Sequence, residues 1–433
     1  MTLFHSTVNT ASQEFQRNRE DMLESINTLR EILDRAATLS DKALPKFQRR
    51  GQLLPRERLS RVLDPGMPFL EILNMAGFMV DDPNRETAVP GCNTICGIGY
   101  ISGVRCMLMV DDSGINAGAM TALSARKGIR AMEIAREKKL PFVHLVESAG
   151  ANLLDYKVEM WMEGGTIFAS LARLSAAGVP TFVVLHGPSA AGGAYMPGMS
   201  DYVIGVKGNG KAYLAGPALL KAATGEEADD QELGGAEMHS RVSGLVEYLA
   251  EDDAPGLAIA RDLIETLDWN RLCPQMPPTE YAEPVYDIDE LAGVVPSDYR
   301  QPYDVREVVA RIVDGSDFLD FKPSYGSATV CMQAKVFGMP VGIIGNNGPI
   351  DNAGATKTAQ FIQLCDQSDI PLVFLQNITG YMVGTEFEQG GMIKHGAKMI
   401  QAVTNTRVPR ITFMIGASFG AGNYGMCGLG YAP

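Results

Sequence analysis

Two clusters of small residues follow strand-like apolar runs, one in each half of the sequence. They are Gly187–Ala194 (Gly-Pro-Ser-Ala-Ala-Gly-Gly-Ala) and Gly416–Asn423 (Gly-Ala-Ser-Phe-Gly-Ala-Gly-Asn). Small residues let a ligand approach the backbone, and a helix that begins just after them presents unpaired N–H groups. Such donors stabilise an oxyanion, and one donor is typically worth ~3–4 kcal/mol of barrier. Tight strand–helix packing is the alternative explanation, but the repetition of the cluster favours the functional one.

Side chains near these clusters offer little conventional catalytic chemistry. Ser189 and Ser418 do not lie in a Gly-x-Ser-x-Gly motif, and no histidine is placed to activate them. A basic turn formed by Arg126, Lys127 and Arg130 is suited to a ligand phosphate, although solvated surface charge is the default. The pairs Gly164-Gly165 and Gly390-Gly391 precede predicted helices, so the same backbone-donor argument applies to them.

Cysteine and histidine spacing gives no metal-site pattern. The seven cysteines are scattered, and only Cys92 and Cys96 lie close together, so we expect reduced and mostly buried thiols. The five histidines form no metal-binding array, and His144 and His186 fall within apolar strand-like runs, which favours structural roles. A metal hydrolase or a Ser-His-Asp enzyme is therefore disfavoured.

The sequence contains an internal repeat. The stretch 113–150 has a counterpart in 348–380, and both contain Asn-Ala-Gly-Ala, at Asn116–Ala119 and Asn352–Ala355. Each copy then has a lysine fourteen residues before a proline: Lys127 before Pro141, and Lys357 before Pro371. The small-residue clusters follow in the same order. These landmarks indicate a duplicated domain.

Each copy alternates short apolar runs with helix-length segments, which predicts an α/β fold with a mostly parallel sheet layered by helices. The expected strands lie in 106–110, 141–146, 181–187, 341–345, 371–376 and 410–416, and the expected helices in 121–138, 164–176, 356–367 and 391–404. A proline-rich stretch, 272–303, predicts the connection between the copies. An amphipathic helix is expected ahead of the first copy, with the apolar residues Met22, Leu23, Ile26, Leu29, Ile32 and Leu33 on one face.

Length and composition limit the possible classes of protein. The 433 residues suit two large domains, and 46% hydrophobic with 20% charged residues is a globular composition. A net charge of −14 disfavours nucleic-acid and anionic-membrane surfaces. No apolar run is long enough for a membrane span, and the N-terminus resembles neither a signal nor a transit peptide. A cytoplasmic protein is expected, with a mitochondrial matrix location the less favoured alternative.

Several longer motifs resemble the carboxyltransferase (beta) subunits of biotin-dependent acyl-CoA carboxylases, members of the crotonase superfamily. The resemblance covers nearly the whole chain, and its last two motifs, with Tyr195–Asp201, are most similar to the geranyl-CoA and 3-methylcrotonyl-CoA branch. The motifs are Gly51–Gly66, Leu214–Glu226, Leu233–Gly244, Gln301–Ser316, Phe374–Gly384 and Gly416–Gly428.

This resemblance implies duplicated crotonase-like domains: an acyl-CoA domain over 1–270 and, over 271–433, a linker with a biotin-side domain. Backbone N–H groups of Ala191, Gly192 and Gly193 would face the thioester oxygen, and those of Ala421 and Gly422 the ureido oxygen of carboxybiotin. Carboxybiotin releases CO2, the biotin anion removes a proton from the acyl chain, and the resulting enolate attacks CO2. The phosphate-binding and helix-start candidates would then contact CoA or biotin: Arg126, Lys127, Gly164, Gly165, Gly390 and Gly391.

The resemblance also implies partners. The chain has no ATP-grasp region and no Ala-Met-Lys-Met biotinylation motif, so biotin and ATP use would come from a biotin carboxylase and carrier (alpha) subunit. Family members form sites between subunits, which implies a homo-oligomer of dimers assembled into a hexamer. They also extend roughly a hundred residues further, so a truncated second domain is expected. No metal is expected in this chain.

One segment departs from the methylcrotonyl-type pattern: Asp112–Met120 carries small residues where that pattern, Ala-Thr-Val-Lys-Gly-Gly-Thr-Tyr-Tyr, has bulk. This favours a larger, geranyl-like acyl chain. Four alternatives stay open: a propionyl-CoA or acetyl-CoA carboxylase subunit, a glutaconyl-CoA-type decarboxylase subunit, a crotonase-like hydratase or isomerase with Glu147 as its candidate acid–base residue, and a non-catalytic scaffold.

Overall fold

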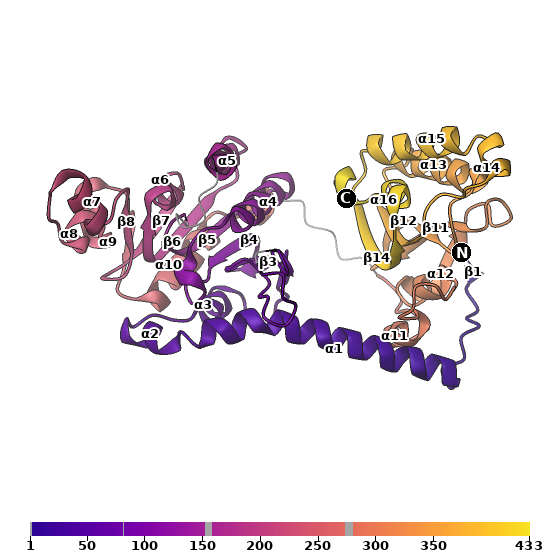
Figure 1. The fold of residues 1–433 in the computed structure, drawn as a ribbon, viewed down its shortest axis with the longest axis horizontal. Coiled ribbons are helices and arrows are strands. Elements are labelled where there is room, and N and C mark those ends of the chain that lie inside the picture. Colours follow the sequence, from indigo (N-terminus) through magenta and orange to yellow (C-terminus); the bar gives the residue numbers. More distant parts are fainter. Residues whose placement is uncertain (1, 81, 152–157, 273–279) are drawn as a thin grey trace. The chain divides into compact units, whose positions relative to one another are not determined.

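The structure is a computed structural model that describes residues 2–80, 82–151, 158–272 and 280–433 (Figure 1). The chain divides into two compact units. The central unit comprises residues 29–276, and the terminal unit comprises residues 1–28 and 277–433. Each unit is built around its own sheet.

The central unit has a sheet of the order β2-β3-β4-β5-β6-β7-β9, with β8 paired to β6. Its strands are β2 (Leu70–Ile72), β3 (Thr94–Ile101), β4 (Val104–Asp111), β5 (Phe142–Ser148), β6 (Thr181–Ala190), β7 (Tyr202–Val206), β8 (Lys211–Tyr213) and β9 (Tyr248–Ala250). The pairings from β4 to β9 are parallel, and β2-β3 and β3-β4 are antiparallel. The predicted mostly parallel sheet is confirmed for this unit.

Helices cover both faces of the central sheet (Figure 1). Alternate residues of β4 point to opposite faces: Leu108 packs with α3 (Pro55–Val62) and α10 (Asp253–Thr266), and Met107 with α4 (Ala122–Lys138) and α5 (Val158–Ala176). The remaining helices of the unit are short: α2 (Leu44–Arg49), α6 (Tyr195–Gly198), α7 (Pro217–Thr224), α8 (Asp230–Gly234) and α9 (Ala236–Met238).

The terminal unit has the sheet order β1-β10-β11-β12-β13-β14. Its strands are β1 (Thr2–Leu3), β10 (Asp317–Asp320), β11 (Thr329–Val336), β12 (Met339–Asn346), β13 (Leu372–Ile378) and β14 (Arg410–Ser418). Only β12-β13 and β13-β14 are parallel among the described pairings of this sheet, so the expectation of a mostly parallel sheet is wrong here. The antiparallel part arises because β10, β11 and β12 follow one another without an intervening helix.

Helices α13 (Asn352–Gln367) and α15 (Met392–Asn405) pack on one face of the terminal sheet, with α14 (Thr385–Gln389) and α16 (Gly420–Gly425) nearby in the chain. The other face packs against α11 (Leu291–Val294), α12 (Val305–Val309) and Phe15. Both units are therefore helix–sheet–helix sandwiches. The predicted strands and helices are confirmed, with shifted ends.

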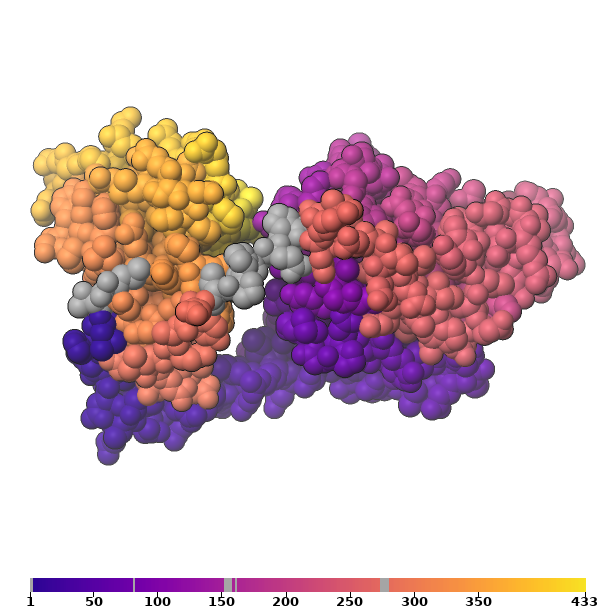
Figure 2. Space-filling model, turned by 180° about the vertical axis from the view of Figure 1, so that it is seen from behind, coloured from indigo at the N-terminus to yellow at the C-terminus, as the bar shows by residue number. Residues whose placement is uncertain are grey.

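Residues 1–28 belong to the terminal unit, whereas the sequence-based division placed them with the acyl-CoA domain. Strand β1 pairs with β10, and Ser6 Oγ donates to Glu307 Oε2 at 2.6 Å. The predicted amphipathic helix is α1 (Gln13–Asp41), whose residues fall in both units. Many of its side chains are exposed and form part of the indigo surface in Figure 2.

The repeat is visible in the backbone. In β5-β6 the register shifts between Val146 and Ser148, and in β13-β14 it shifts between Gln376 and Ile378. Isolated bridges join Met120 to Ala151 and Ile350 to Tyr381. The duplication extends to α3 and α12. Asp64 and Asp314 each lie nine residues after the first residue of the helix, and each carboxylate accepts two backbone N–H groups of the next hairpin.

The two Asn-Ala-Gly-Ala motifs are not equivalent, which corrects the sequence alignment. Asn116–Gly118 forms a 3-10 turn between β4 and α4, whereas Asn352 is the first residue of α13. The β4–α4 connection is longer than the β12–α13 connection, and the extra residues contain the first motif. The N-caps Thr121 and Asp351 are the equivalent positions, consistent with the pairing of Lys127 with Lys357.

Candidate active site

Each small-residue cluster forms the same backbone turn at the end of a parallel strand. We name residues 190–194, which begin at the last residue of β6, the central loop, and residues 419–423, which follow β14, the terminal loop. Ala191 and Gly420 have positive φ angles of 53° and 51°, and each follows an extended residue, Ala190 or Phe419. The exposure pattern of the last four residues also matches between the two loops, with the third helical residue buried in each: Gly193 and Gly422.

The first N–H groups of both turns are available to a ligand. No side chain caps the 3-10 turn Ala191–Ala194 or helix α16, so these donors have no intrahelical partner. Ala191, Gly192, Gly420 and Ala421 are exposed. The arrangement is suited to binding a partially negative oxygen at each loop.

Glycine is required to different degrees in the two loops. A Cβ atom on Gly422 would lie 2.7 Å from Ile378 Cγ1 and 3.0 Å from Gly380 Cα, which is backbone. A Cβ atom on Gly193 would lie 3.1 Å from Ser189 Oγ, and one on Gly192 would meet only Phe168 at 3.4 Å. The terminal loop is therefore packed more closely against its strand than the central loop.

Neutral side chains support the terminal loop. Gln376 Oε1 accepts from Ser418 Oγ at 2.6 Å and from Asn423 Nδ2 at 3.3 Å, and Gln376 Nε2 donates to Met426 O at 2.8 Å. Asn377 Oδ1 accepts from the backbone N of Ala417 at 3.1 Å. These bonds join β13, β14 and α16 without using a charged group.

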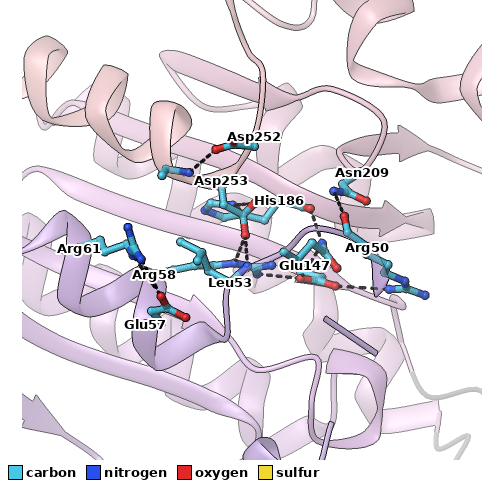
Figure 3. A network of polar contacts seen from close by, with 12 residues as sticks. Arg50, Leu53, Glu57, Arg58, Arg61, Glu147, His186, Asn209, Asp252 and Asp253 are labelled. Carbon is cyan, nitrogen blue, oxygen red and sulfur yellow. Dashed lines mark hydrogen bonds and ion pairs between the residues drawn. The ribbon is translucent and has the colours of Figure 1, made fainter. Parts of the chain in front are cut away.

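A group of charged side chains lies on β5 and β6, the strands before the central loop, and on helices α3 and α10 (Figure 3). Arg58 donates from Nη1 to Glu147 Oε2 at 2.7 Å and from Nε to Asp253 Oδ2 at 2.9 Å. Asp253 Oδ1 is 2.7 Å from Nδ1 of His186, and Gln52 Nε2 donates to His186 O at 2.7 Å. All these residues are buried. We name Arg58, Glu147, His186 and Asp253 the charged network.

Protonation within the charged network follows from burial and pairing. Burial is the largest influence on His186 and lowers its pKa, so the ring is neutral. Burial alone would raise the pKa of Asp253, but the His186 hydrogen bond and the Arg58 charge lower it to about 2. Glu147 is 2% exposed and its Oε2 is occupied by Arg58, so it is not placed as a free acid–base residue for the hydratase alternative.

The basic turn does not form one phosphate site. Lys127 is 3% exposed, and its Nζ donates to the backbone oxygens of Gly91 and Thr94, so the predicted phosphate contact from Lys127 is wrong. Burial lowers its pKa. The equivalent Lys357 is also buried and donates to Lys322 O at 3.3 Å. The repeated lysine is structural because an amphipathic helix turns it towards the sheet.

Arg126 and Gly164-Gly165 lie on facing helices, α4 and α5. Arg126 is exposed and pairs with Glu163 Oε2 at 3.0 Å. The prediction that Gly164-Gly165 precede a helix is wrong: both lie inside α5, which begins at Val158, so they lack helix-start donors. Gly390 and Gly391 do precede a helix, as the C-cap of α14 and the N-cap of α15, and Gly391 has a φ of 85°.

Sequence reasoning missed Arg58 and Asp253, which complete the charged network. For their partners, the sequence predicts a structural role for His186 in a strand and, in the hydratase alternative, an acid–base role for Glu147. The available signal was a charged residue on the apolar face of a helix: Arg58 lies between the buried Pro55 and Leu59 in α3. That pattern predicts a buried ion pair but not its partners.

Three further features bear on the site. Five of the six described cysteines are buried, as predicted, and none of the six is joined by a disulfide to another described cysteine; Cys273 lies outside the described residues. No group of metal-ligating side chains is found in the described residues. Within the same ranges, no helix is long and apolar enough to cross a membrane.

The Asp112–Met120 segment is closely packed where it meets β5. A Cβ atom on Gly118 would lie 2.4 Å from Glu147 O. Asp112 and Ile115 line a cavity of about 240 Å³ together with Arg56 and Glu71, which form an ion pair at 3.1 Å. The small residues of this segment therefore serve close backbone packing as well as any effect on ligand volume.

Comparison with known proteins assigns the chain and its fold to one class. Residues 46–433 match the carboxyl transferase domain family. The β subunit of geranyl-CoA carboxylase from P. aeruginosa has 51% identity and a TM-score of 0.93, covering 100% of this chain and 81% of that one. The 12S subunit of transcarboxylase, described as a hexamer, has 31% identity and a TM-score of 0.52, covering 95% and 81%.

Curated relatives point the same way. A biotin-dependent 3-methylcrotonyl-coenzyme A carboxylase beta1 subunit of Mycobacterium tuberculosis is 46% identical over 398 residues, 91% of this chain and 74% of that one. The mitochondrial methylcrotonoyl-CoA carboxylase beta chain of Dictyostelium discoideum is 44% identical over 435 residues, 100% and 73%. The protein is thus a crotonase-like carboxyltransferase. Within that class, the chain belongs to the carboxyltransferase (beta) subunits of biotin-dependent acyl-CoA carboxylases.

Proposed function

We propose that this subunit carboxylates a 3-methyl-2-enoyl-CoA, with geranyl-CoA as the preferred substrate and 3-methylcrotonyl-CoA as the closest competitor. The observation that carries the proposal is the similarity to the geranyl-CoA carboxylase β subunit, 51% identical with a TM-score of 0.93 over the whole chain. The small residues of Asp112–Met120 add support, because they remove bulk that the methylcrotonyl-type pattern carries.

In this proposal the two loops bind the two reacting oxygens. The N–H groups of Ala191, Gly192 and Gly193 hold the thioester oxygen, which becomes an enolate oxygen when the acyl chain loses a proton. Those of Ala421 and Gly422 hold the ureido oxygen of biotin. The uncapped turns at both loops support these roles, because each presents donors without an intrahelical partner.

The loops themselves hold no acid or base, since neither 190–194 nor 419–423 contains an ionisable side chain. Carboxybiotin, carried by an alpha subunit, supplies both the CO2 and the proton-accepting nitrogen in this proposal. The contribution of this chain is electrostatic: fixed backbone dipoles stabilise the charge that develops on oxygen, which lowers the barrier without a proton transfer to the protein.

The surrounding candidates divide between the two ligands. Arg126 is exposed and is proposed to attract a CoA phosphate, in competition with Glu163. Gly390 and Gly391 precede the uncapped helix α15 and are proposed to contact biotin. We also propose that the chain forms a homohexamer, which the hexamer of the 12S relative supports. A bacterial, cytoplasmic location is proposed as well, supported by the relative from P. aeruginosa.

A direct test uses the purified chain with free biotin. Biotin-dependent decarboxylation would be followed with three carboxylated substrates: isohexenylglutaconyl-CoA, 3-methylglutaconyl-CoA and methylmalonyl-CoA. We expect turnover that requires biotin and is fastest with isohexenylglutaconyl-CoA. Preference for 3-methylglutaconyl-CoA or methylmalonyl-CoA would overturn the acyl-chain assignment, and no turnover with intact acyl-CoA binding would overturn the reaction.

A further inference from the structure

The charged network has no counterpart in the repeated half. Asp64 and Asp314 are equivalent, and counting six residues back from each aligns Arg58 with Val308. Along the strands, Glu147 aligns with Asn377 and His186 with Ile415. Val308 is buried in the apolar core of the terminal unit. The terminal unit therefore has an apolar and an amide side chain where the central unit has an ion pair, so this fold does not require an ion pair at these positions.

Arg58 is tightly held between its partners. Its side chain is fully buried, lies over the Phe47 ring at 5.6 Å, and meets Glu147 and Asp253 on two sides. Asp253 also accepts from the backbone N of Leu53 at 2.8 Å. Because the donors of a guanidinium are planar and fixed, the bonds from Nε and Nη1 of Arg58 fix the separation of the two carboxylates that it joins.

Arg58 joins Glu147 on β5 to Asp253, the first residue of α10, and Asp253 in turn contacts His186 on β6. Glu147 is followed by Ser148, which pairs with Ser189 just before the loop. The Glu147 side chain also packs on the backbone of Gly187, where a Cβ atom would lie 2.4 Å from Glu147 Cγ. His186 is on β6 itself and is reached through Asp253 (Figure 3).

We propose that Arg58 is a positioning residue, which fixes the backbone of the central loop by joining Glu147 of β5 to the Asp253–His186 pair. The expected effect of Arg58 on turnover rests on the proposed function, which assigns the central loop to the thioester oxygen. The expected effect of Arg58 on the conformation of the loop depends only on the contacts of the charged network described above. Arg58 acts through the strands and does not touch the reacting atoms.

Charge balance gives the proposal a pH signature. Arg58 and the half-exposed Arg50, 3.8 Å from Glu147, balance Glu147 and Asp253, while His186 is neutral. Three further titratable groups lie nearby. Asp111 Oδ2 accepts from Glu147 N at 3.2 Å, and Asp111 Oδ1 lies 3.2 Å from His144 Nε2. Burial raises the pKa of Asp112, and the Arg58 charge lowers it. The Arg58 charge lowers the pKa values of both His186 and Asp253, so its removal would raise them, and protonation would then replace the lost positive charge. The resulting defect should weaken as pH falls.

The terminal unit supplies a matched control. Arg311 is 1% exposed, pairs with Glu290 at 2.7 Å and Glu307 at 2.9 Å, and lies 5.2 Å from the Tyr286 ring. It has the same burial, two carboxylates and one aromatic contact as Arg58, but these partners do not belong to β13 or β14. Arg58→Met and Arg311→Met should therefore lose similar stability and differ in their effect on the loops.

The experiment compares both variants with the wild-type chain by amide hydrogen exchange of peptides 187–196 and 416–425, at temperatures where each variant is folded. We expect Arg58→Met to exchange about tenfold faster in 187–196 only, because local opening becomes easier. For biotin-dependent decarboxylation we expect kcat to fall about a hundredfold with KM within about threefold, since the loop is misplaced rather than removed. The fall should be larger at pH 8 than at pH 6.

Unchanged exchange in 187–196 for Arg58→Met, or equal changes in both arginine variants, would overturn the proposal. If Arg58→Met does not fold, Glu147→Gln decides, because it keeps the shape and weakens the same contact; it should show the same effects to a lesser degree. A wild-type chain without biotin-dependent turnover would refute the proposed function, and the exchange comparison would still decide the positioning role.

Discussion

The central and terminal loops share one backbone conformation but are held in place by different chemistry. Behind the central loop, Arg58, Glu147, Asp253 and His186 form a buried charged network. Behind the terminal loop, Gln376, Asn377, Ser418 and Asn423 form a neutral one. A duplicated fold has kept the turn that presents N–H groups and has changed what supports it.

The difference shows that loop geometry and loop support are separable. The turn depends on local requirements: an extended residue, a positive φ at Ala191 or Gly420, and a buried glycine two positions later. The support depends on residues far apart in the sequence. Charged support is more sensitive to pH and to single substitutions than amide support, since an unpaired buried charge costs more than an unpaired amide.

The largest expected effect concerns the glycines of the loops. Gly422→Ala places a Cβ atom 2.7 Å from Ile378 and against the backbone of Gly380, so we expect a loss of about 1–3 kcal/mol in the free energy of unfolding. Biotin-dependent turnover should fall about a hundredfold while acyl-CoA binding persists, since the terminal loop is displaced. Denaturant unfolding, steady-state kinetics and calorimetric CoA titration would measure these effects.

Gly192→Ala is the matched control. The repeat already has alanine at the equivalent position, Ala421, and the new Cβ would meet only Phe168 at 3.4 Å. We expect little change in the free energy of unfolding, because the new Cβ atom meets no backbone atom and only the tip of one side chain. Equal losses for both variants would show that the two loops are packed alike, contrary to the comparison.

The charged network should make the stability of the central unit sensitive to acid. Asp253 has a pKa of about 2 in the folded chain against 3.8 for an unperturbed carboxyl, so its ionised form stabilises the fold above pH 4. This contribution, about 2 kcal/mol, is lost as pH falls from 4 towards 2. The lowered pKa of His186 acts in the same direction, from its ordinary value of 6.5 downwards, because charging the buried ring destabilises the fold.

Asp253→Asn should therefore be less stable than wild type at pH 6 and should lose less stability on acidification. Both tryptophans of the chain belong to the central unit, so fluorescence-detected urea unfolding at pH 6, 4 and 3 reports on that unit. Asp262→Asn, on the exposed side of the same helix, is the control. A parallel pH dependence in wild type and Asp253→Asn would contradict the assigned pairing.

The sequence was sufficient for what is local and repeated. Apolar runs predicted β4, β5, β6, β12, β13 and β14, and the cluster spacing identified both loops. It misplaced the start of α5 because two glycines cost a helix only about 1 kcal/mol each, less than Ile167, Leu171 and Leu174 gain by burial. The charged network could not be predicted from the sequence, because Arg58 and Asp253 are separated by 195 positions and no local pattern pairs them.

Lys127 and Lys357 are buried at equivalent positions of the two units, and their substitution tests whether both are structural. Lys127→Met leaves the carbonyls of Gly91 and Thr94 without this donor, and we expect a loss of about 1–3 kcal/mol in the free energy of unfolding. Lys357→Met removes one long bond and should cost less. Neither should change the KM for acyl-CoA by more than about twofold, since neither charge reaches solvent. A tenfold rise in KM for Lys127→Met alone would restore its phosphate role.

The smallest expected effect concerns surface charge beside the central loop. The position equivalent to Arg126 in the terminal unit is Thr356, whose Oγ1 is 2.8 Å from His395 Nδ1, so only the central unit carries a cation there. Arg126 and Glu163 are 66% and 63% exposed, and breaking their ion pair should change stability by less than about 0.5 kcal/mol.

Arg126→Ala should raise the KM for acyl-CoA about threefold at low salt, with no change at high salt, because screening removes an exposed phosphate–guanidinium attraction. Glu163→Gln should lower the KM slightly, because it frees Arg126 from its competitor. Opposite shifts from the two substitutions would identify Arg126 as a phosphate contact, whereas shifts in the same direction would show that the ion pair itself matters. Thr356→Ala, at the equivalent position of the terminal unit, should leave this KM unchanged. A shift there comparable to that of Arg126→Ala would contradict the assignment of acyl-CoA to the central loop.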